Sequence, residues 1–344
     1  MTEKREKKNM SAAHAVALFS GGLDSILAIL LLRRQEIRIT ALTFVHDFTA
    51  ETDDNLALGK SGADLAERFG FEIELINPGR PFIDLVKNPP RGYGKNMNPC
   101  LDCRIMMLRE ARRRMEQLGA DFVATGEVLG QRPMSQYRPS LNQVEKESGL
   151  RGLLIRPLSA KLMPETIPEQ NGLVDREMLE SISGRSRKRQ MEMAADFGLE
   201  TYPNPASGCL LTDPSYSRRL KDFLEHNSDI EINDINLLKV GRHFRLSPGV
   251  KVIVGRNEQD NDRICELAGP EHILLEVLHT GSPVTLYAGP VDDTLIARAA
   301  ALTARYCDLK DHDRVEVTCV SGGSGKTYRV APARPDEYRD EIIT

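Results

Sequence analysis

The stretch from residue 14 to residue 34 constrains the fold most, because a hydrophobic strand runs directly into a glycine turn and a helix. Residues 16–19 (VALF) form an apolar run with the length of a buried strand. SGGLDS (20–25) follows, and its two glycines turn the backbone where a side chain would obstruct it. Residues 26–34 form an amphipathic segment that predicts a helix. An ordinary strand–helix turn is the alternative, but N–H groups and the dipole at such a helix start favour an anion, so we expect a phosphate site.

The rest of the first half alternates strands and helices in the same way. Strands are predicted over 37–45, 71–76 and 121–125, helices over 55–69, 100–118 and 176–197, and loops over 88–99 and 202–208. This alternation predicts an α/β fold with a doubly wound parallel sheet, whose ligands bind at the carboxyl ends of its strands. SGGLDS and Thr125–Gly126 both lie at the carboxyl ends of predicted strands, so one crevice could hold one nucleotide.

The pattern changes after residue 220 to shorter elements. We therefore expect a disordered tail over 1–12, a first domain over 13–220 and a second, smaller α+β domain over 221–344. Within the latter, strands are predicted near 250–254 and 314–320 and a helix near 292–306. SGGSGKT (321–327) is similar to a Walker A loop, but Val320 stands where that loop needs glycine. A hairpin turn explains these glycines better.

Charge and hydropathy limit the partners of the chain. The 344 residues carry a net charge of −4, so local basic clusters would have to bind any RNA. Two candidate clusters, each of which could equally be a solvated helix face, are Arg109, Arg112, Arg113 and Arg114, and Arg185, Arg187, Lys188 and Arg189. The charged N-terminus has no apolar signal segment, and no apolar run could span a bilayer. A cytoplasmic protein without membrane contact is expected.

Three cysteines lie just after predicted loops rather than in apolar runs. Cys100 and Cys103 form a CxxC where a loop becomes a helix, and Cys209 follows the second loop. Zinc would usually want a fourth ligand, and a redox CxxC would normally follow a thioredoxin-like strand. Three cysteines on a [4Fe–4S] cluster would leave one iron free to bind sulfide. Buried structural cysteines are the remaining alternative. Cys265, Cys307 and Cys319 fall in apolar runs and are expected in the core.

Three motifs together resemble known families. SGGLDS resembles the loop of the PP-loop ATP pyrophosphatases, and TGEVLGQRPMSQ (125–136) with IRPLSAK (155–161) is similar to the tRNA 4-thiouridine synthetases. Cys100, Cys103 and Cys209 match the three-cysteine, iron–sulfur type of these enzymes. The resemblance covers about residues 14–220, although the family signature has one residue fewer between its two glutamines. Finally, VGRHFRL (240–246) and VIVGRNEQDNDRI (252–264) look like the RNA-binding domain of NFACT proteins.

The resemblance implies ATP-dependent thiolation of a tRNA uridine. A uracil oxygen would attack the α-phosphorus of ATP, and sulfur from sulfide or a persulfide would then displace AMP. The implied nucleotide contacts are Leu18, Phe19, Ser20, Gly21, Gly22, Asp24, Ser25, Phe44, Arg104, Gly126 and Gln136. Asp24 would hold or orient Mg²⁺, Arg104 would neutralise charge on the α-phosphate, and the three cysteines would deliver sulfur.

Several questions stay open at this point. The phosphate loop could adenylate a different acceptor, for amidation or ligation, and the chain could also be a non-catalytic RNA-binding protein. The cysteines disfavour the first alternative, and the intact SGGLDS disfavours the second. The sequence does not decide between a monomer and a homodimer, between thiolation at position 4 and position 2, or among sulfur donors, and no general base stands out.

Overall fold

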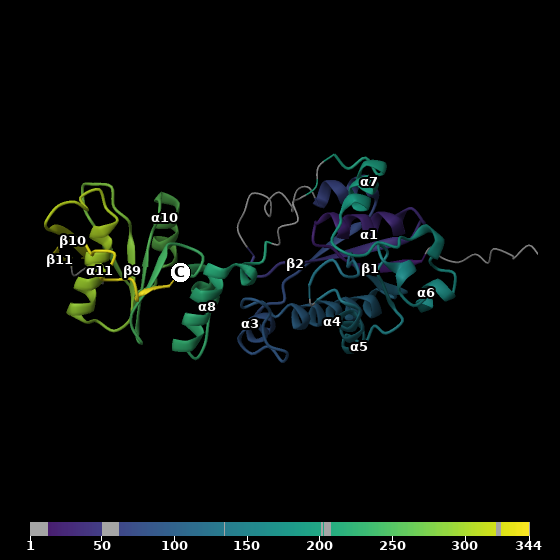
Figure 1. Cartoon of the computed structure of the whole chain (residues 1–344), viewed down its shortest axis with the longest axis horizontal. Helices are drawn as coiled ribbons and strands as arrows, with labels where there is room; N and C mark the ends of the chain where they lie inside the picture. Colours follow the sequence, from purple (N-terminus) through teal and green to yellow (C-terminus); the bar gives the residue numbers. More distant parts are fainter. Residues whose placement is uncertain are drawn as a thin grey trace, which may run out of the picture. The chain divides into compact units, whose positions relative to one another are not determined.

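The computed structural model describes residues 13–49, 62–133, 135–200, 202, 208–320 and 325–343. The chain divides into two compact units, residues 1–209 and 210–344 (Figure 1). The tail predicted over 1–12 and parts of the segments predicted over 55–69 and 202–208 lie outside the described residues. The domain boundary predicted after residue 220 falls inside helix α8 (Pro214–His226), which belongs to the second unit.

The first unit is built on a five-stranded parallel sheet with the strand order β3-β2-β1-β4-β5. Its strands are β1 (His14–Leu18), β2 (Arg38–Phe44), β3 (Glu72–Ile76), β4 (Phe122–Ala124) and β5 (Leu154–Ile155). The first four lie close to the predicted positions. The order changes direction between β1 and β4, and open α/β sheets bind ligands at such a switch point. SGGLDS follows β1 and Thr125–Gly126 follows β4, so both predicted site segments lie at this switch point.

Helices cover both faces of this sheet, because alternate residues of a strand point to opposite sides. Ala15 and Ala17 of β1 pack in one core with α1 (Leu23–Arg33) and α7 (Lys188–Asp196). Val16 and Leu18 pack in another core with α4 (Cys100–Leu118) and α5 (Arg138–Glu147). The doubly wound arrangement is therefore confirmed.

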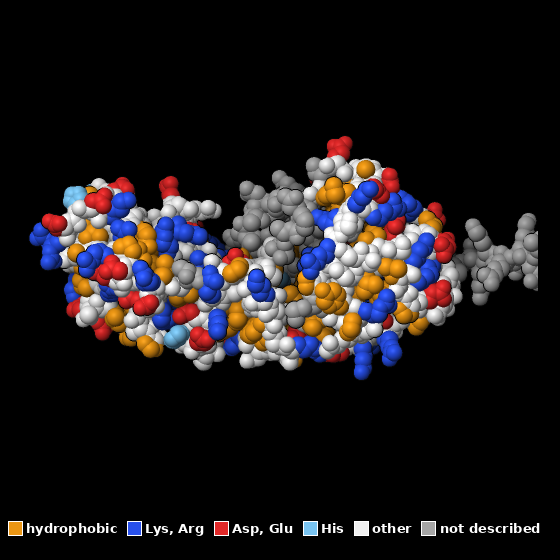
Figure 2. All heavy atoms as spheres, in the orientation of Figure 1, with side chains coloured by type: hydrophobic (Ala, Val, Ile, Leu, Met, Phe, Trp, Pro, Cys, Tyr) orange, Lys and Arg blue, Asp and Glu red, His pale blue; other side chains and the backbone are white. Residues whose placement is uncertain are grey.

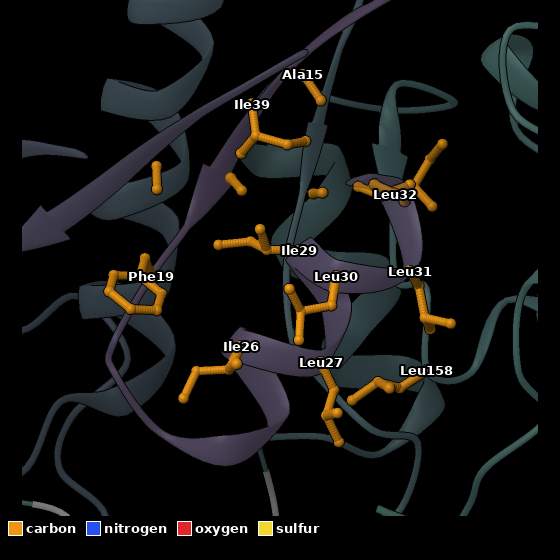
Figure 3. Close-up of a cluster of buried hydrophobic side chains, with 14 of the residues drawn as sticks. Ala15, Phe19, Ile26, Leu27, Ile29, Leu30, Leu31, Leu32, Ile39 and Leu158 are labelled. Atoms are coloured by element: carbon orange, nitrogen blue, oxygen red, sulfur yellow. The ribbon is translucent and has the colours of Figure 1, made fainter. Parts of the chain in front are cut away.

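The expectation that the helix after SGGLDS is amphipathic is wrong. Within α1, every residue from Leu23 to Leu32 is buried except Asp24, which is half-buried. In Figure 3 its side chains point in several directions, toward Ile39 of the sheet and toward Leu158. Helix α7 packs on the side of α1 that faces away from the sheet, so α1 is buried on nearly all sides. A helix buried in this way is apolar all round.

The helix predicted over 176–197 is only partly present. A 3₁₀ turn at Arg176–Met178 and helix α7 are separated by an extended segment, in which Ser183 pairs with Leu129. Buried Leu179 and Ile182 draw this segment into the core. Helices α3 (Arg80–Lys87) and α5 were not predicted; both are short and carry proline in the first turn.

The second unit contains a seven-stranded antiparallel sheet, which confirms a second α+β domain. The strand order is β11-β10-β8-β9-β7-β6-β12. The strands are β6 (Arg242–Ser247), β7 (Val250–Val254), β8 (Ile273–Glu276), β9 (Thr285–Ala288), β10 (Val315–Val320), β11 (Lys326–Val330) and β12 (Ile342–Ile343). Helix α11 (Asp293–Arg305) packs on one face, and α9 (Ile232–Leu237) and α10 (Glu258–Leu267) pack on the other.

Two smaller predictions concern this unit. Strands β10 and β11 pair antiparallel, as the hairpin prediction requires, although residues 321–324 lie outside the described part of the chain. Cys307 and Cys319 are buried as expected, but Cys265 is exposed, so its placement in the core is wrong. Its neighbour Ile264 takes the inward position on α10, which turns Cys265 toward solvent. No helix in the described ranges is long and apolar enough to cross a membrane.

Candidate nucleotide and cysteine site

Hydrogen bonds of the Ser25 hydroxyl stabilise the glycine turn after β1. Gly21 adopts a positive φ of 70°, which favours glycine. The Ser25 hydroxyl donates to the Gly22 carbonyl at 2.8 Å and accepts from the Ser20 N–H at 3.3 Å. No side chain caps the first turn of α1. Its first N–H groups, which an α-helix leaves without intrahelical partners, therefore suit an anion such as phosphate.

Gly126 brings the loop after β4 directly against this turn. A Cβ atom at Gly126 would lie 2.6 Å from the Asp24 carbonyl and from the Ser25 nitrogen. No side chain fits in that space without displacing the backbone of α1. The absence of a side chain at position 126 therefore lets the two loops meet at the switch point.

Asp24 contacts a residue that the sequence analysis did not single out. Gln131 donates its amide Nε2–H to Asp24 Oδ2 at 2.9 Å. Asp24 Oδ1 and Gln131 Oε1 are both buried and accept no hydrogen bond within the described residues. Buried acceptors of this kind normally have a partner. A carboxylate oxygen left unsatisfied at a phosphate loop fits a Mg²⁺ ligand, since Mg²⁺ prefers oxygen donors.

The other predicted nucleotide contacts lie in or beside the core. Leu18 and Phe44 pack in the core under α4, whereas Phe19 packs on the opposite face against Phe71. Gln136 is 6% exposed, and its Oε1 accepts from the Arg132 backbone N–H at 3.1 Å. That bond links Gln136 to the backbone of the same loop. Leu18 is the last residue of β1, and Phe19 directly precedes the turn over 20–25.

A buried charge network joins the cysteine helix to the loop after β4. Glu127 is 3% exposed, and its Oε1 lies 3.3 Å from Arg104 Nε while its Oε2 lies 3.1 Å from Arg156 Nε. Although burial raises the pKa of Glu127, the two guanidinium groups and a hydrogen bond from Thr125 hold it below its ordinary value. Arg156 also pairs with Glu145 at 3.1 Å. Arg104 is thereby fixed beside the site.

The three predicted cysteines all belong to the first unit. Cys100 is exposed and opens α4, Cys103 lies one turn later, and Cys209 pairs with Thr49 in an isolated bridge. Burial raises the pKa of Cys103 to about 12; Arg104 opposes that shift, and nearby Cys209 and Cys100 add to it. In the described residues no three Cys, His, Asp or Glu side chains stand close enough for a single metal ion. A cubane cluster spaces its thiolates more widely than one ion does, and three thiols near one another match the type of donor that such a cluster takes.

Arg91 connects the loop before the CxxC to the helix that carries the two cysteines. Asp102, between the two cysteines, is 4% exposed and accepts from the Arg91 backbone N–H at 3.1 Å. The Arg91 guanidinium pairs with Asp102 and with Glu147 at the end of α5. The loop over 88–99 is therefore anchored to both α4 and α5.

The two basic clusters differ in how well their charges are paired. On α4, Arg112 pairs with Glu116, Arg113 with Glu110 and Arg114 with Glu74, so these arginines are largely neutralised. In the first turn of α7, Arg189 pairs with Glu180 and with Glu192. Figure 2 shows Lys and Arg side chains gathered beside α7.

Arg187 stands out within the second cluster. It is the first residue before α7, and its buried Nε has no hydrogen-bond partner within the described residues. The Gly184 N–H donates to the Leu129 carbonyl at 2.7 Å. This segment therefore joins the loop that also carries Gly126 and Gln131.

A separate cavity of about 930 Å³ lies beside α5 and β5 and is lined by residues such as Glu145, Arg156 and Glu169. None of the predicted site residues lines it.

The sequence analysis also missed Glu127, Gln131 and Arg156 as site residues, although all three lie inside the motifs at 125–136 and 155–161. Their charged or amide side chains within these two motifs were the available signal.

Comparison with known proteins finds one family match in each unit. Residues 10–162 match the family model described as thiamine biosynthesis protein (ThiI). Residues 241–342 match the NFACT protein RNA binding domain. These two matched segments are called the ThiI-type domain and the NFACT-type domain below. The ThiI-type domain contains the glycine turn over 20–25, called the phosphate turn below, together with the CxxC and the signature at 125–136. Cys209 lies beyond the matched residues.

Two curated relatives of part of the chain are described as tRNA-specific 2-thiouridylase MnmA. The protein from Syntrophomonas wolfei is 34% identical over 117 residues, which cover 32% of this chain and 31% of the relative. The protein from Chlorobium chlorochromatii is 26% identical over 248 residues, which cover 68% of this chain and 66% of the relative. The chain thus spans from about a third to about two thirds of the length of these relatives.

Two solved structures are also similar in part. A 4-thiouridine synthetase in complex with RNA and ATP is 23% identical, with a TM-score of 0.37, over 54% of this chain and 52% of that chain. The U34-tRNA thiolase NcsA from Methanococcus maripaludis, solved with its [4Fe–4S] cluster, is 15% identical, with a TM-score of 0.32, over 57% of this chain and 60% of that chain.

Proposed function

We propose that the protein thiolates a tRNA uridine in an ATP-dependent reaction. The observation that carries this proposal is the Arg104–Glu127 pair, which ties the cysteine helix to the loop that packs on the phosphate turn. A site for activating an oxygen and a site for delivering sulfur therefore share one end of the sheet. The ThiI-type domain and the two relatives described as 2-thiouridylases support the same reaction class.

In the first step, ATP binds with its pyrophosphate on the turn over 20–25. Mg²⁺ would take the free Oδ1 of Asp24 as a ligand, while Gln131 orients that carboxylate. A uracil carbonyl oxygen attacks the α-phosphorus, so a P–O bond forms and pyrophosphate leaves. Arg104, held by Glu127, neutralises the charge that develops on the α-phosphate.

In the second step, sulfur replaces the adenylated oxygen. A C–S bond forms at the uracil carbon, and the C–O bond breaks as AMP leaves. Cys100, Cys103 and Cys209 would hold a [4Fe–4S] cluster that, when bound, supplies one iron without a protein ligand for sulfide. The high pKa of Cys103 means that its thiol needs a bound cation to lose its proton at neutral pH.

The NFACT-type domain would bind the tRNA substrate. Its half of the sequence is acidic, with 15 Lys and Arg against 21 Asp and Glu over 221–344, so folded RNA would be recognised by shape and stacking more than by charge. The cytoplasm is the compartment where such a substrate is made.

The test is anaerobic purification of the full chain, followed by iron and sulfide analysis and incubation with unmodified tRNA, Mg-ATP and sulfide. We expect iron in the protein, AMP release and a thionucleoside in the digested tRNA. Cys103→Ala should abolish the thionucleoside, whereas Cys307→Ala, in the second unit, should not. A colourless protein without iron, or full sulfur transfer by Cys103→Ala, would contradict the proposal. AMP release without tRNA thiolation would instead indicate a different acceptor.

A further inference from the structure

A side chain outside the predicted site makes a direct hydrogen bond to one of the cysteines. Asn98 lies two residues before Cys100 in the loop that leads into α4. Its amide Nδ2–H donates to Cys100 Sγ at 3.1 Å. The sequence analysis assigns no role to this asparagine.

The surrounding loop fixes which end of the Asn98 amide faces the sulfur. The Asn96 backbone N–H donates to Asn98 Oδ1 at 3.0 Å, so the oxygen end of the amide is identified by its donor. The NH₂ end must then point toward Cys100. Oxygen and nitrogen of an amide are distinguished by such a network of partners.

The backbone of the same loop is built around the Asn98 side chain. The Gly94 N–H donates to the Asn98 carbonyl at 2.9 Å and closes the turn over 94–98. A Cβ atom at Gly94 would lie only 2.5 Å from Asn98 Nδ2. Glycine at position 94 therefore leaves the space that the amide occupies, and the loop holds the amide in one orientation.

We propose that Asn98 is a positioning residue of the cysteine site, whose amide hydrogen bond holds Cys100 as a ligand and raises the reduction potential of the bound [4Fe–4S] cluster. This inference rests on the proposed function, because it requires the cluster. Hydrogen bonds to ligand sulfurs are one of the factors that set cluster potentials. A donor at the sulfur stabilises the reduced, more negatively charged state, and partners of metal ligands also fix ligand orientation.

Two variants separate the donor from the shape of the side chain. Asn98→Leu removes both polar ends without adding charge. Asn98→Asp keeps an acceptor for the Asn96 N–H but replaces the donor with a carboxylate oxygen near the sulfur. Asn88→Asp is the matched control, because Asn88 is exposed at the end of α3 in the same loop region.

The experiment loads each full-length variant with iron and sulfide under anaerobic conditions, then measures iron per chain and the potential by spectroelectrochemistry. We expect a lower potential for Asn98→Leu, a still lower one for Asn98→Asp, and no change for Asn88→Asp. A tenfold shift in the one-electron equilibrium would appear as about 59 mV. Thermal unfolding of each variant verifies that it is folded.

The possible results are distinct. Full loading with an unchanged potential in both Asn98 variants would overturn the inference and leave the proposed function intact. Loss of iron from both folded variants, with Asn88→Asp fully loaded, would support the role of Asn98 in holding Cys100. A wild-type chain that takes up no iron would overturn the cluster itself, and the inference with it.

Discussion

Arg104 Nε lies 3.3 Å from Glu127 Oε1, so the cation next to Cys103 is held by a carboxylate on the loop that packs against the phosphate turn. Arg104 also opposes the upward shift in the pKa of Cys103 caused by burial. One guanidinium group thus interacts both with Cys103 and with the loop that follows β4. Glu127 is its counter-charge, and Arg156 holds the other oxygen of Glu127.

Removing the charge of Glu127 should destabilise the first unit. Glu127→Gln would leave buried Arg156 with only Glu145 as a carboxylate partner, and breaking a buried ion pair costs about 3 kcal/mol. The free energy of unfolding from urea titration measures this effect. Glu72→Gln is the control, because Glu72 and Arg38 form a pair whose side chains are both more than half exposed. That variant should change stability by less than about 1 kcal/mol. Equal losses in both variants would argue against a buried network.

Adding a methyl group at Gly126 should separate the two loops. Gly126→Ala places a Cβ atom 2.6 Å from the Asp24 and Ser25 backbones, so α1 must shift. We expect a loss of about 1–3 kcal/mol in stability, as for other overpacked sites, and ATP binding weaker by about tenfold or more. Calorimetric titration with ATP measures the binding. Gly249→Ala, where the nearest atom would be 4.0 Å away, should affect neither quantity. Unchanged ATP binding in Gly126→Ala would contradict the close approach.

The two cysteines of the CxxC should differ in reactivity when no metal is bound. Cys100 is exposed, whereas burial raises the pKa of Cys103 to about 12, so little of Cys103 is thiolate at pH 8. Iodoacetamide at pH 8 should therefore modify Cys103 roughly tenfold or more slowly than Cys100. Peptide mapping by mass spectrometry follows both sites in one sample, with buried Cys307 as an internal reference. Equal rates at Cys100 and Cys103 would show that the pKa of Cys103 is not raised.

Lys251 should make the stability of the second unit depend on pH. Burial lowers the pKa of Lys251 to about 8, although Asp222, 3.0 Å away, opposes that shift. Between about pH 8 and 10.5 the unfolded chain binds the proton that the folded chain has lost, so stability rises with pH in this window. The full contribution is about 3 kcal/mol.

Lys251→Met should remove this rise, because methionine does not titrate. Urea unfolding of the wild type and the variant at pH 7.5 and pH 10 measures how the free energy of unfolding of each protein changes with pH. Subtracting one change from the other removes the contribution of the other groups that titrate in this range. Lys221→Met, at an exposed position on α8, is the control and should behave like the wild type. A parallel pH dependence in Lys251→Met and the wild type would contradict a depressed pKa.

Much of the first unit follows from local sequence patterns. The strand, glycine turn and helix over 14–33 are each determined by residues next to one another, and so is the start of α4 after the loop at 88–99. The motifs at 20–25 and 125–136 also identify their ligand class, because a phosphate loop depends on glycines and N–H groups within a few residues. The antiparallel pairing of β10 with β11 follows from the hairpin pattern in the same way.

Tertiary structure alone decided the features that depend on distant segments. Helix α1 is buried on nearly all sides because α7, more than 150 residues later, packs on it. The segment before α7 is extended because Ser183 pairs with Leu129. The pairing of Arg104 with Glu127 and the approach of Gly126 to Asp24 are likewise set by strand order. Spacing along the chain determines which side chains can form a local motif. Only the sheet order and the packing of its helices determine which motifs lie close enough to form one site.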